Sequence, residues 1–117
     1  MNDGTQDQVE VSFPASPIFS RIAKVAVVGL ALRLGVGVSP VEQLRTAVDQ
    51  AVGYLHGEGR ITLKAQWQPH QLSIAMHNPD IELDSDRQTQ VIGDLSSLVD
   101  EVKVDSGSIR IILASLQ

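Results

Sequence analysis

The residues that could carry chemistry in this sequence are few, and their spacing favours no single reaction. His56, His70 and His77 fall at an expected helix end, in a turn and on a strand, without the paired spacing of zinc ligands. Acidic residues alternate from Asp80 to Asp86, but the run lacks the central glycine and terminal glutamate of an EF-hand, which favours a solvated loop. The chain has no cysteine, which excludes thiolate chemistry and disulfides, and no serine lies in a nucleophile-elbow motif. We therefore expect no bound metal.

Two helix-start signals organise the first half of the chain. A Ser-Pro pair at 16–17 predicts a first helix that runs to about Leu34. Ser39 and Glu42 have the spacing of a capping box, which predicts a second helix starting at Pro40. This second helix has one apolar stripe, made of Leu44, Ala47, Val48, Ala51, Val52 and Leu55.

Alternation of apolar and polar residues predicts five strands, at 9–13, 60–68, 72–77, 102–104 and 109–113. A third helix is expected at about 89–99, with Val91, Ile92, Leu95, Leu98 and Val99 on its apolar side. The order β-α-α-β-β-α-β-β predicts an α+β, two-layer sandwich, in which three helices cover one face of a mainly antiparallel mixed sheet of about five strands. We expect residues 1–7 to form a disordered tail and residues 8–117 a single domain.

Composition narrows the classes of function. The chain has 117 residues, 43% of them hydrophobic and 20% charged, which suits one globular domain. Its net charge of −5 lacks the basic surplus needed to neutralise phosphates, so nucleic acid is not an expected partner. The longest apolar run, from Val25 to Leu32, is far shorter than the ~20 residues of a membrane span. No secretory signal opens the sequence, which predicts a cytoplasmic protein without a membrane partner.

The element order resembles the histidine-kinase-like ATPase fold, and specifically the bacterial anti-sigma factor serine kinases. Residues 44–55, LRTAVDQAVGYL, look like the second-helix motif of that family, and residues 98–112, LVDEVKVDSGSIRII, look like its closing segment. The V-x-V-x-F-P-A stretch at 9–15 is also typical. The resemblance covers nearly the whole chain and implies an ATP site with magnesium between the second and third helices.

The resemblance also shows that the functional residues are altered. In the family, a glutamate on the second helix activates the attacking group, and an asparagine four residues later holds the magnesium ion. Gln50 and Tyr54 occupy the matching positions. An amide has no useful basicity near neutral pH, and a phenol is a poor ligand for a hard octahedral cation. The neutral alternative is that Gln50 is a half-exposed amide and that Tyr54 packs over the sheet edge.

The adenine-binding elements implied by the resemblance are altered too. Asn78 stands where the family has an aspartate that binds the adenine amino group, and Asp80 stands where it has a glycine. The glycine-rich lid would fall at 85–91, SDRQTQV, which contains no glycine. We therefore expect a degenerate nucleotide site, and no cofactor.

The leading hypothesis is a non-catalytic, anti-sigma-factor-like regulatory module that has lost ATP binding. The resemblance implies a sigma factor or a sigma-regulator protein as partner, and a homodimer. The alternative is an active serine/threonine kinase that binds ATP and magnesium through altered ligands, with Asn78 and Asp49 as its remaining supports. A third reading is a small-molecule sensor whose pocket is lined by Tyr54 and Trp67.

The first helix supplies the expected partner surface. If Ile22 marks the centre of its core face, the opposite face contains Lys24, Val27, Val28 and Ala31. Apolar residues gathered at helical spacing on an outer face indicate a protein contact. We therefore predict that these four residues bind a partner or a second copy. The alternative is that the flanking chain or the N-terminal tail covers this face. The second helix and the sheet edge are further candidate contact surfaces.

Overall fold

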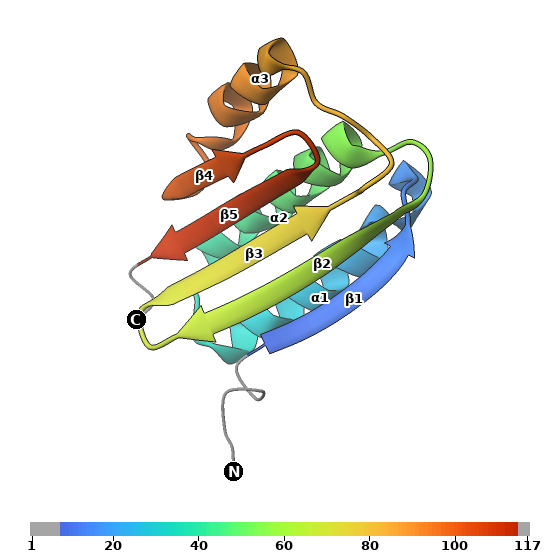
Figure 1. Ribbon diagram of the computed structural model, residues 1–117. Helices are drawn as coiled ribbons and strands as arrows, with labels where there is room; N and C mark the ends of the chain where they lie inside the picture. The colour runs from blue at the N-terminus through green and yellow to red at the C-terminus, as the bar shows by residue number, and fades with distance from the viewer. Residues whose placement is uncertain (1–7, 115–117) are drawn as a thin grey trace.

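The computed structural model describes residues 8–114, which form a five-stranded sheet with helices packed against one face (Figure 1). The predicted tail at 1–7 lies outside the described residues. The elements, in chain order, are β1 (Gln8–Pro14), the 3-10 turn η2 (Pro17–Phe19), α1 (Ser20–Arg33), α2 (Val38–Leu55), β2 (Arg60–Gln68), β3 (Gln71–His77), α3 (Ser85–Leu95), β4 (Glu101–Val104) and β5 (Ser108–Ala114). The predicted element order is confirmed.

The strands lie in the order β1-β2-β3-β5-β4, and all four neighbouring pairs are antiparallel. The expected α+β class, five strands and mainly antiparallel pairing are confirmed, but we expected a mixed sheet, and within residues 8–114 no parallel pair occurs. The predicted hairpin of β2 and β3 is confirmed, with Thr62 opposite His77 at one end and Gln68 opposite Gln71 at the other. Alternation along both strands sets this register, because a slip of one residue would turn every apolar side chain to the solvent face.

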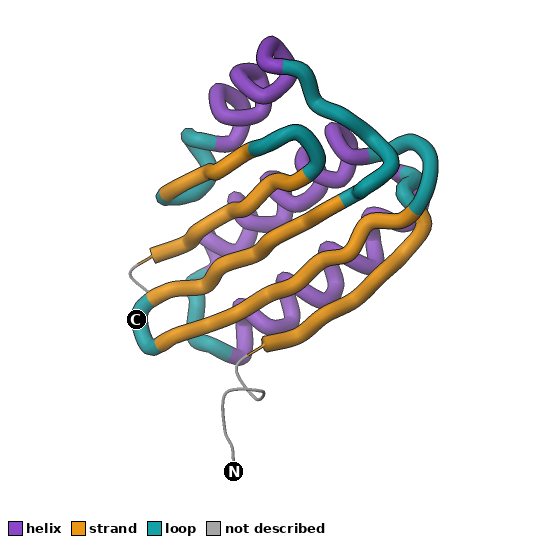
Figure 2. Tube along the Cα trace, viewed as in Figure 1, coloured by secondary structure: helices purple, strands orange, loops and turns teal. Residues whose placement is uncertain are grey.

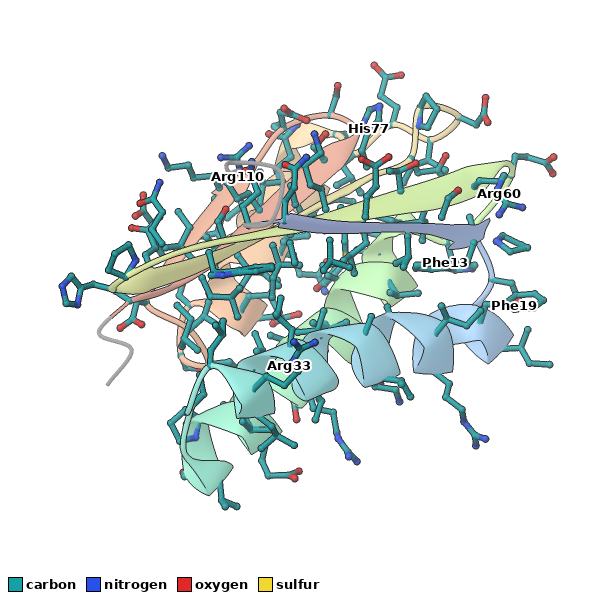
Figure 3. All side chains as sticks on the ribbon, turned by 90° about the horizontal axis from the view of Figure 1, so that it is seen from below. Phe13, Phe19, Arg33, Arg60, His77 and Arg110 are labelled. Carbon is teal, nitrogen blue, oxygen red and sulfur yellow. The ribbon has the colours of Figure 1, made fainter. Side chains whose placement is uncertain are left out.

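The core lies between the sheet and the helices. All six residues of the predicted α2 stripe are fully buried, which confirms that face of the helix. Phe13 enters the core from β1, on the side of the sheet that α1 and α2 cover (Figure 3). None of the helices described here has the length and apolar content needed to cross a bilayer.

The predicted capping box of α2 is wrong. The helix begins two residues early, at Val38, and Gly37 is its N-cap, with no side-chain cap hydrogen bond. Ser39 and Pro40 are therefore the second and third helical residues. Proline is tolerated there because the first backbone N–H groups of a helix have no partner within it.

The predicted position of the third helix is about four residues late. Helix α3 spans Ser85–Leu95, and the carboxylate of Asp84 caps it by accepting the backbone N–H of Arg87 at 2.8 Å. Val91 and Leu95 are buried as expected, whereas Ile92 is exposed. Val99 is also buried, but it reaches the core from the segment after the helix.

The predicted orientation of the first helix is wrong. Val27 and Ala31, expected on an outer partner surface, are 1% and 0% exposed, whereas Ile22, expected at the core, is 43% exposed. The face that packs on the core includes Ala23 and Ala31, whose small side chains allow close approach. Of the other two predicted surface residues, Val28 packs at the core margin and Lys24 is half-buried.

Candidate functional site

Of the two residues singled out on the second helix, Tyr54 lies where α2 faces α3. Gln50 is exposed, and Tyr54, one turn later, is half-buried at the core margin. The Tyr54 hydroxyl donates a hydrogen bond to the carboxylate of Asp94 on α3. The guanidinium of Arg87, also on α3, lies over the Tyr54 ring at 5.2 Å from its centroid, which is within the range of a cation–π contact. Tyr54 therefore bridges the two helices between which the resemblance places the nucleotide.

The environment of Tyr54 favours the neutral phenol. Desolvation by burial raises the pKa of Tyr54 above its ordinary value of 10.0, and the hydrogen bond and negative charge of Asp94 raise it further. Arg87 opposes them by lowering the pKa. A neutral phenol that already donates its proton to a carboxylate has no charge to offer a magnesium ion.

Asn78, expected at the adenine position, is fully buried. Its amide nitrogen donates to the carbonyl oxygens of Leu55 at 2.8 Å and Glu58 at 3.0 Å, and its side-chain oxygen accepts the backbone N–H of Asp80 at 2.9 Å. Both amide protons of the side chain are therefore used within the fold. Asn78 joins the end of α2 to the end of β3.

Asp80 lies against the loop between α2 and β2. A Cβ built on Gly59 would come within 2.0 Å of Asp80 Oδ2, so this carboxylate packs directly over the glycine backbone. Gly59 has φ of +81°, a left-handed conformation that glycine adopts without strain. The resemblance implies a glycine at position 80, which would let the backbone approach the adenine base. Asp80 instead packs its side chain on the loop between α2 and β2.

Residues 85–91, where the resemblance puts the lid, form the first part of α3, and the loop that leads to them from β3 is held down at several points. The backbone N–H of Asn78 donates to Gly107 O at 3.0 Å, and that of Leu83 donates to Ser106 O at 2.6 Å. These bonds hold the loop beside the β4–β5 turn, as Figure 2 shows for the path from β3 to α3. Leu83 is buried, and its carbonyl accepts the Gln88 side-chain amide at 2.8 Å. The loop is a packed part of the domain.

Asp49, the alternative proton acceptor, lies on the wrong side of α2. Its carboxylate pairs with Lys24 Nζ of α1 at 3.2 Å. Tyr54 is directed to α3 instead, so Asp49 and Tyr54 face different neighbours of α2.

The topology also separates Tyr54 from Trp67. Tyr54 lies near the end of α2, close to where β2 begins, and Trp67 is near the far end of β2. At ~3.3 Å per residue, the strand carries Trp67 about 20 Å from its start. The shared small-molecule pocket is therefore contradicted. A hollow of about 450 Å³ lies elsewhere, between the α1–α2 loop and the segment that joins α3 to β4.

The histidines and acidic residues do not converge. Within residues 8–114, no group of three or more His, Asp or Glu side chains could hold a metal ion. His56 Nδ1 contacts Gly53 O at 2.8 Å, and His77 Nδ1 contacts Gly107 O at 3.0 Å. Asp84 caps α3, and the other acidic side chains of this loop are exposed.

Two residues of the α2–α3 contact, Arg87 and Asp94, were not foreseen. They are seven positions apart, two helical turns, and therefore lie on one face of α3. The seven-residue spacing is the feature of the sequence that could have placed Arg87 and Asp94 on the same face of the helix. Placing the helix start at residue 89 left Arg87 in the preceding loop and hid the relationship.

The apolar face that α1 leaves in solvent differs from the predicted one. Ile18 on η2 is 79% exposed, and Val25 and Leu32 on α1 are 66% and 55% exposed. With Ile22 and the exposed Gly29 they form a line at spacings of four and three residues. We call Ile18, Ile22, Val25, Gly29 and Leu32 the α1 seam.

Comparison of the chain with models of known protein families and with curated proteins gave no match. The resemblance to the anti-sigma factor serine kinases therefore depends on the quoted sequence segments and the element order.

Proposed function

We propose that this protein is a regulatory protein-binding module of the anti-sigma type, with a histidine-kinase-like ATPase fold that does not use ATP. The observation that carries the proposal is the contact of Tyr54 with Asp94 and Arg87. It joins α2 to α3 at the position that the resemblance assigns to magnesium. The buried hydrogen bonds of Asn78 and the packing of Asp80 on Gly59 support the same conclusion for the adenine position.

The α1 seam is the proposed partner surface. Its spacing of four and three residues approximates the 3.5-residue period along which one helix packs against another. A Cβ built on Gly29 meets nothing within 4 Å, so this position leaves room for a partner helix to approach closely. The seam therefore suits an amphipathic helix of a partner protein, which the resemblance would make a sigma factor or a sigma-regulator protein.

Charge identifies the kind of helix that fits. Helix α1 contains no acidic residue, and the exposed Arg21 and Arg33 flank the seam, although the chain as a whole has a net charge of −5. A partner helix with acidic residues beside its apolar stripe would complement these arginines. A second α1 would bring only further cations. The expected homodimer would therefore use another surface.

The experiment is a set of titrations against purified bacterial sigma factors and sigma regulators, with and without magnesium-ATP. We expect one of them to bind equally well under both conditions. Val25→Glu and Leu32→Glu should each weaken that binding by about tenfold or more, because each places a charge on the seam. Gln90→Glu, which adds the same charge to the exposed face of α3, is the matched control.

Each variant is first checked for an unchanged thermal melt, so that loss of binding is not loss of folding. If the partner binds the Val25→Glu and Gln90→Glu variants with equal affinity, the α1 seam is not the partner surface. Binding that requires ATP would contradict the proposed loss of nucleotide use.

A further inference from the structure

The face of the sheet that points away from α1 and α2 carries an arrangement that the proposed function does not use. His77 on β3 and Arg110 on β5 both extend from this face (Figure 3). With Ala75, Lys103, Asp105 and Ser108 they line a hollow of about 310 Å³, bordered also by Met76, Val104 and Ile109. We call this the sheet hollow.

Strand pairing places two cations side by side at the hollow. Lys103 on β4 is directly opposite Arg110 on β5, and Ala75 on β3 is the other direct neighbour of Arg110. Like charges directly opposite each other on one face of a sheet are destabilising. The alanine contributes little bulk between the longer side chains of His77 and Arg110, and so leaves room for a ligand.

The carboxylates nearby do not offset this charge well. Lys103 Nζ is 3.7 Å from Glu101, and the side chains of the pair are 64% and 54% exposed, so the attraction is weak. Asp105 uses one carboxylate oxygen to accept the backbone N–H of Gly107 at 3.1 Å. Within residues 8–114, no ion pair involves Arg110.

One neutral donor, the hydroxyl of Ser108, completes the site. His77 Nδ1 lies 3.0 Å from Gly107 O and 2.8 Å from Ser108 Oγ. Because a carbonyl oxygen only accepts, Nδ1 carries the proton of this contact, and the Ser108 hydroxyl can accept there and still donate its own hydrogen. A planar guanidinium, an ammonium and a hydroxyl around one hollow are donors suited to a phosphate group.

We propose that the sheet hollow binds a phosphate group, either free or as a small phosphate monoester, with Arg110 and Lys103 as its charged donors and Ser108 as its neutral donor. The phosphate would neutralise the two facing cations. This site lies on the opposite side of the sheet from the α1 seam and does not depend on the proposed function.

The test is an NMR titration of backbone amides with inorganic phosphate and with O-phosphoserine, against chloride at matched ionic strength. We expect saturable shifts centred on Ser108 and Arg110 with phosphate but not with chloride. Arg110→Gln should weaken binding by about tenfold, while Arg45→Gln, which removes one exposed charge from α2, should leave it unchanged. Tighter binding of O-phosphoserine would identify an ester as the ligand, and equal or weaker binding would identify free phosphate.

Stability gives a second measurement. Phosphate should raise the melting temperature of the native chain and of the Arg45→Gln variant, but not that of the Arg110→Gln variant. The proposal is overturned if chloride reproduces the phosphate shifts, if no residue of the hollow shifts, or if the Arg110→Gln and Arg45→Gln variants bind equally.

Discussion

The hydroxyl of Tyr54 on α2 donates a hydrogen bond to the carboxylate of Asp94 on α3. This bond connects two helices that are separated in the chain by the β2–β3 hairpin. It bears on the proposed function because the resemblance implies a nucleotide site between these two helices, where Tyr54, Asp94 and Arg87 meet.

The first prediction concerns the strength of that connection. Tyr54→Phe removes only the hydroxyl and should lower the free energy of unfolding by about 0.5–1 kcal/mol, a modest value because the bond is partly exposed. Urea unfolding measures this. Asp94→Asn should have a similar effect, and the double variant should lose less than the sum of the two. Strictly additive losses would mean that the two side chains do not interact.

The second prediction concerns pH. Tyr54 is the only tyrosine in the chain, so ultraviolet absorbance reports its ionisation without ambiguity. Burial and Asp94 raise its pKa, so the midpoint in the folded protein should lie above 10.0 and should fall in the Asp94→Asn variant. A midpoint at or below the ordinary value would contradict the described environment.

The raised pKa of Tyr54 also determines how the stability of the protein depends on pH. Because the folded state holds the Tyr54 proton more tightly than the unfolded state, its contribution to stability is complete below pH 10.0 and is lost as the pH rises through the raised pKa. The stability of the Tyr54→Phe variant should therefore decline less steeply above pH 10.0 than that of the native chain.

The third prediction concerns Asn78. Asn78→Asp restores the residue type that the resemblance assigns to adenine recognition, yet it should destabilise the fold by about 1–3 kcal/mol. The reason is that an ionised carboxylate cannot donate to the carbonyls of Leu55 and Glu58, which would face it in a buried site. Chemical denaturation measures the loss, with Gln90→Glu, which adds the same charge at an exposed position of α3, as the control. An Asn78→Asp variant as stable as the native chain would argue against a role of Asn78 in joining the end of α2 to the end of β3.

The fourth prediction compares two helix starts. Asp84→Ala should cost about 1 kcal/mol, since it removes the cap of α3. Ser39→Ala should change stability by a few tenths at most, because Ser39 is inside α2 and not its cap. Thermal or urea unfolding of the two variants distinguishes them. A loss of stability for Ser39→Ala as large as that for Asp84→Ala would support the capping box that the sequence predicted.

The two-residue alternation in the sheet made its β2–β3 hairpin predictable, and the single apolar stripe of α2 made its buried face predictable. Helix α1 was oriented wrongly because it is apolar on most sides. Ile22 and Val25 are as hydrophobic as Val27, so pattern alone does not identify the core face, and the decisive feature was the close packing of Ala23 and Ala31. Because alanine is only weakly hydrophobic, a hydrophobicity pattern does not reveal a helix face that packs through alanines.

The candidate site was predictable only in part. That residues 50, 54 and 80 differ from those implied by the resemblance is visible in the sequence, whereas the contacts made by the residues present are not. The bonds from Asn78 to the end of α2 and from Tyr54 to α3 join segments distant in the chain, and they depend on tertiary arrangement. The extension of the third helix's apolar side to Val99 shifted that helix by about four residues, which left Arg87 outside it and concealed the relationship of Arg87 to Asp94.

The most direct measurement is calorimetric titration of the full chain with magnesium-ATP. If the protein has lost ATP binding, as proposed, magnesium-ATP should show no binding tighter than a Kd of about 100 µM, which corresponds to about −5.5 kcal/mol. Saturable binding tighter than that, reduced when Tyr54 or Asn78 is substituted, would contradict the proposal that the protein does not bind ATP.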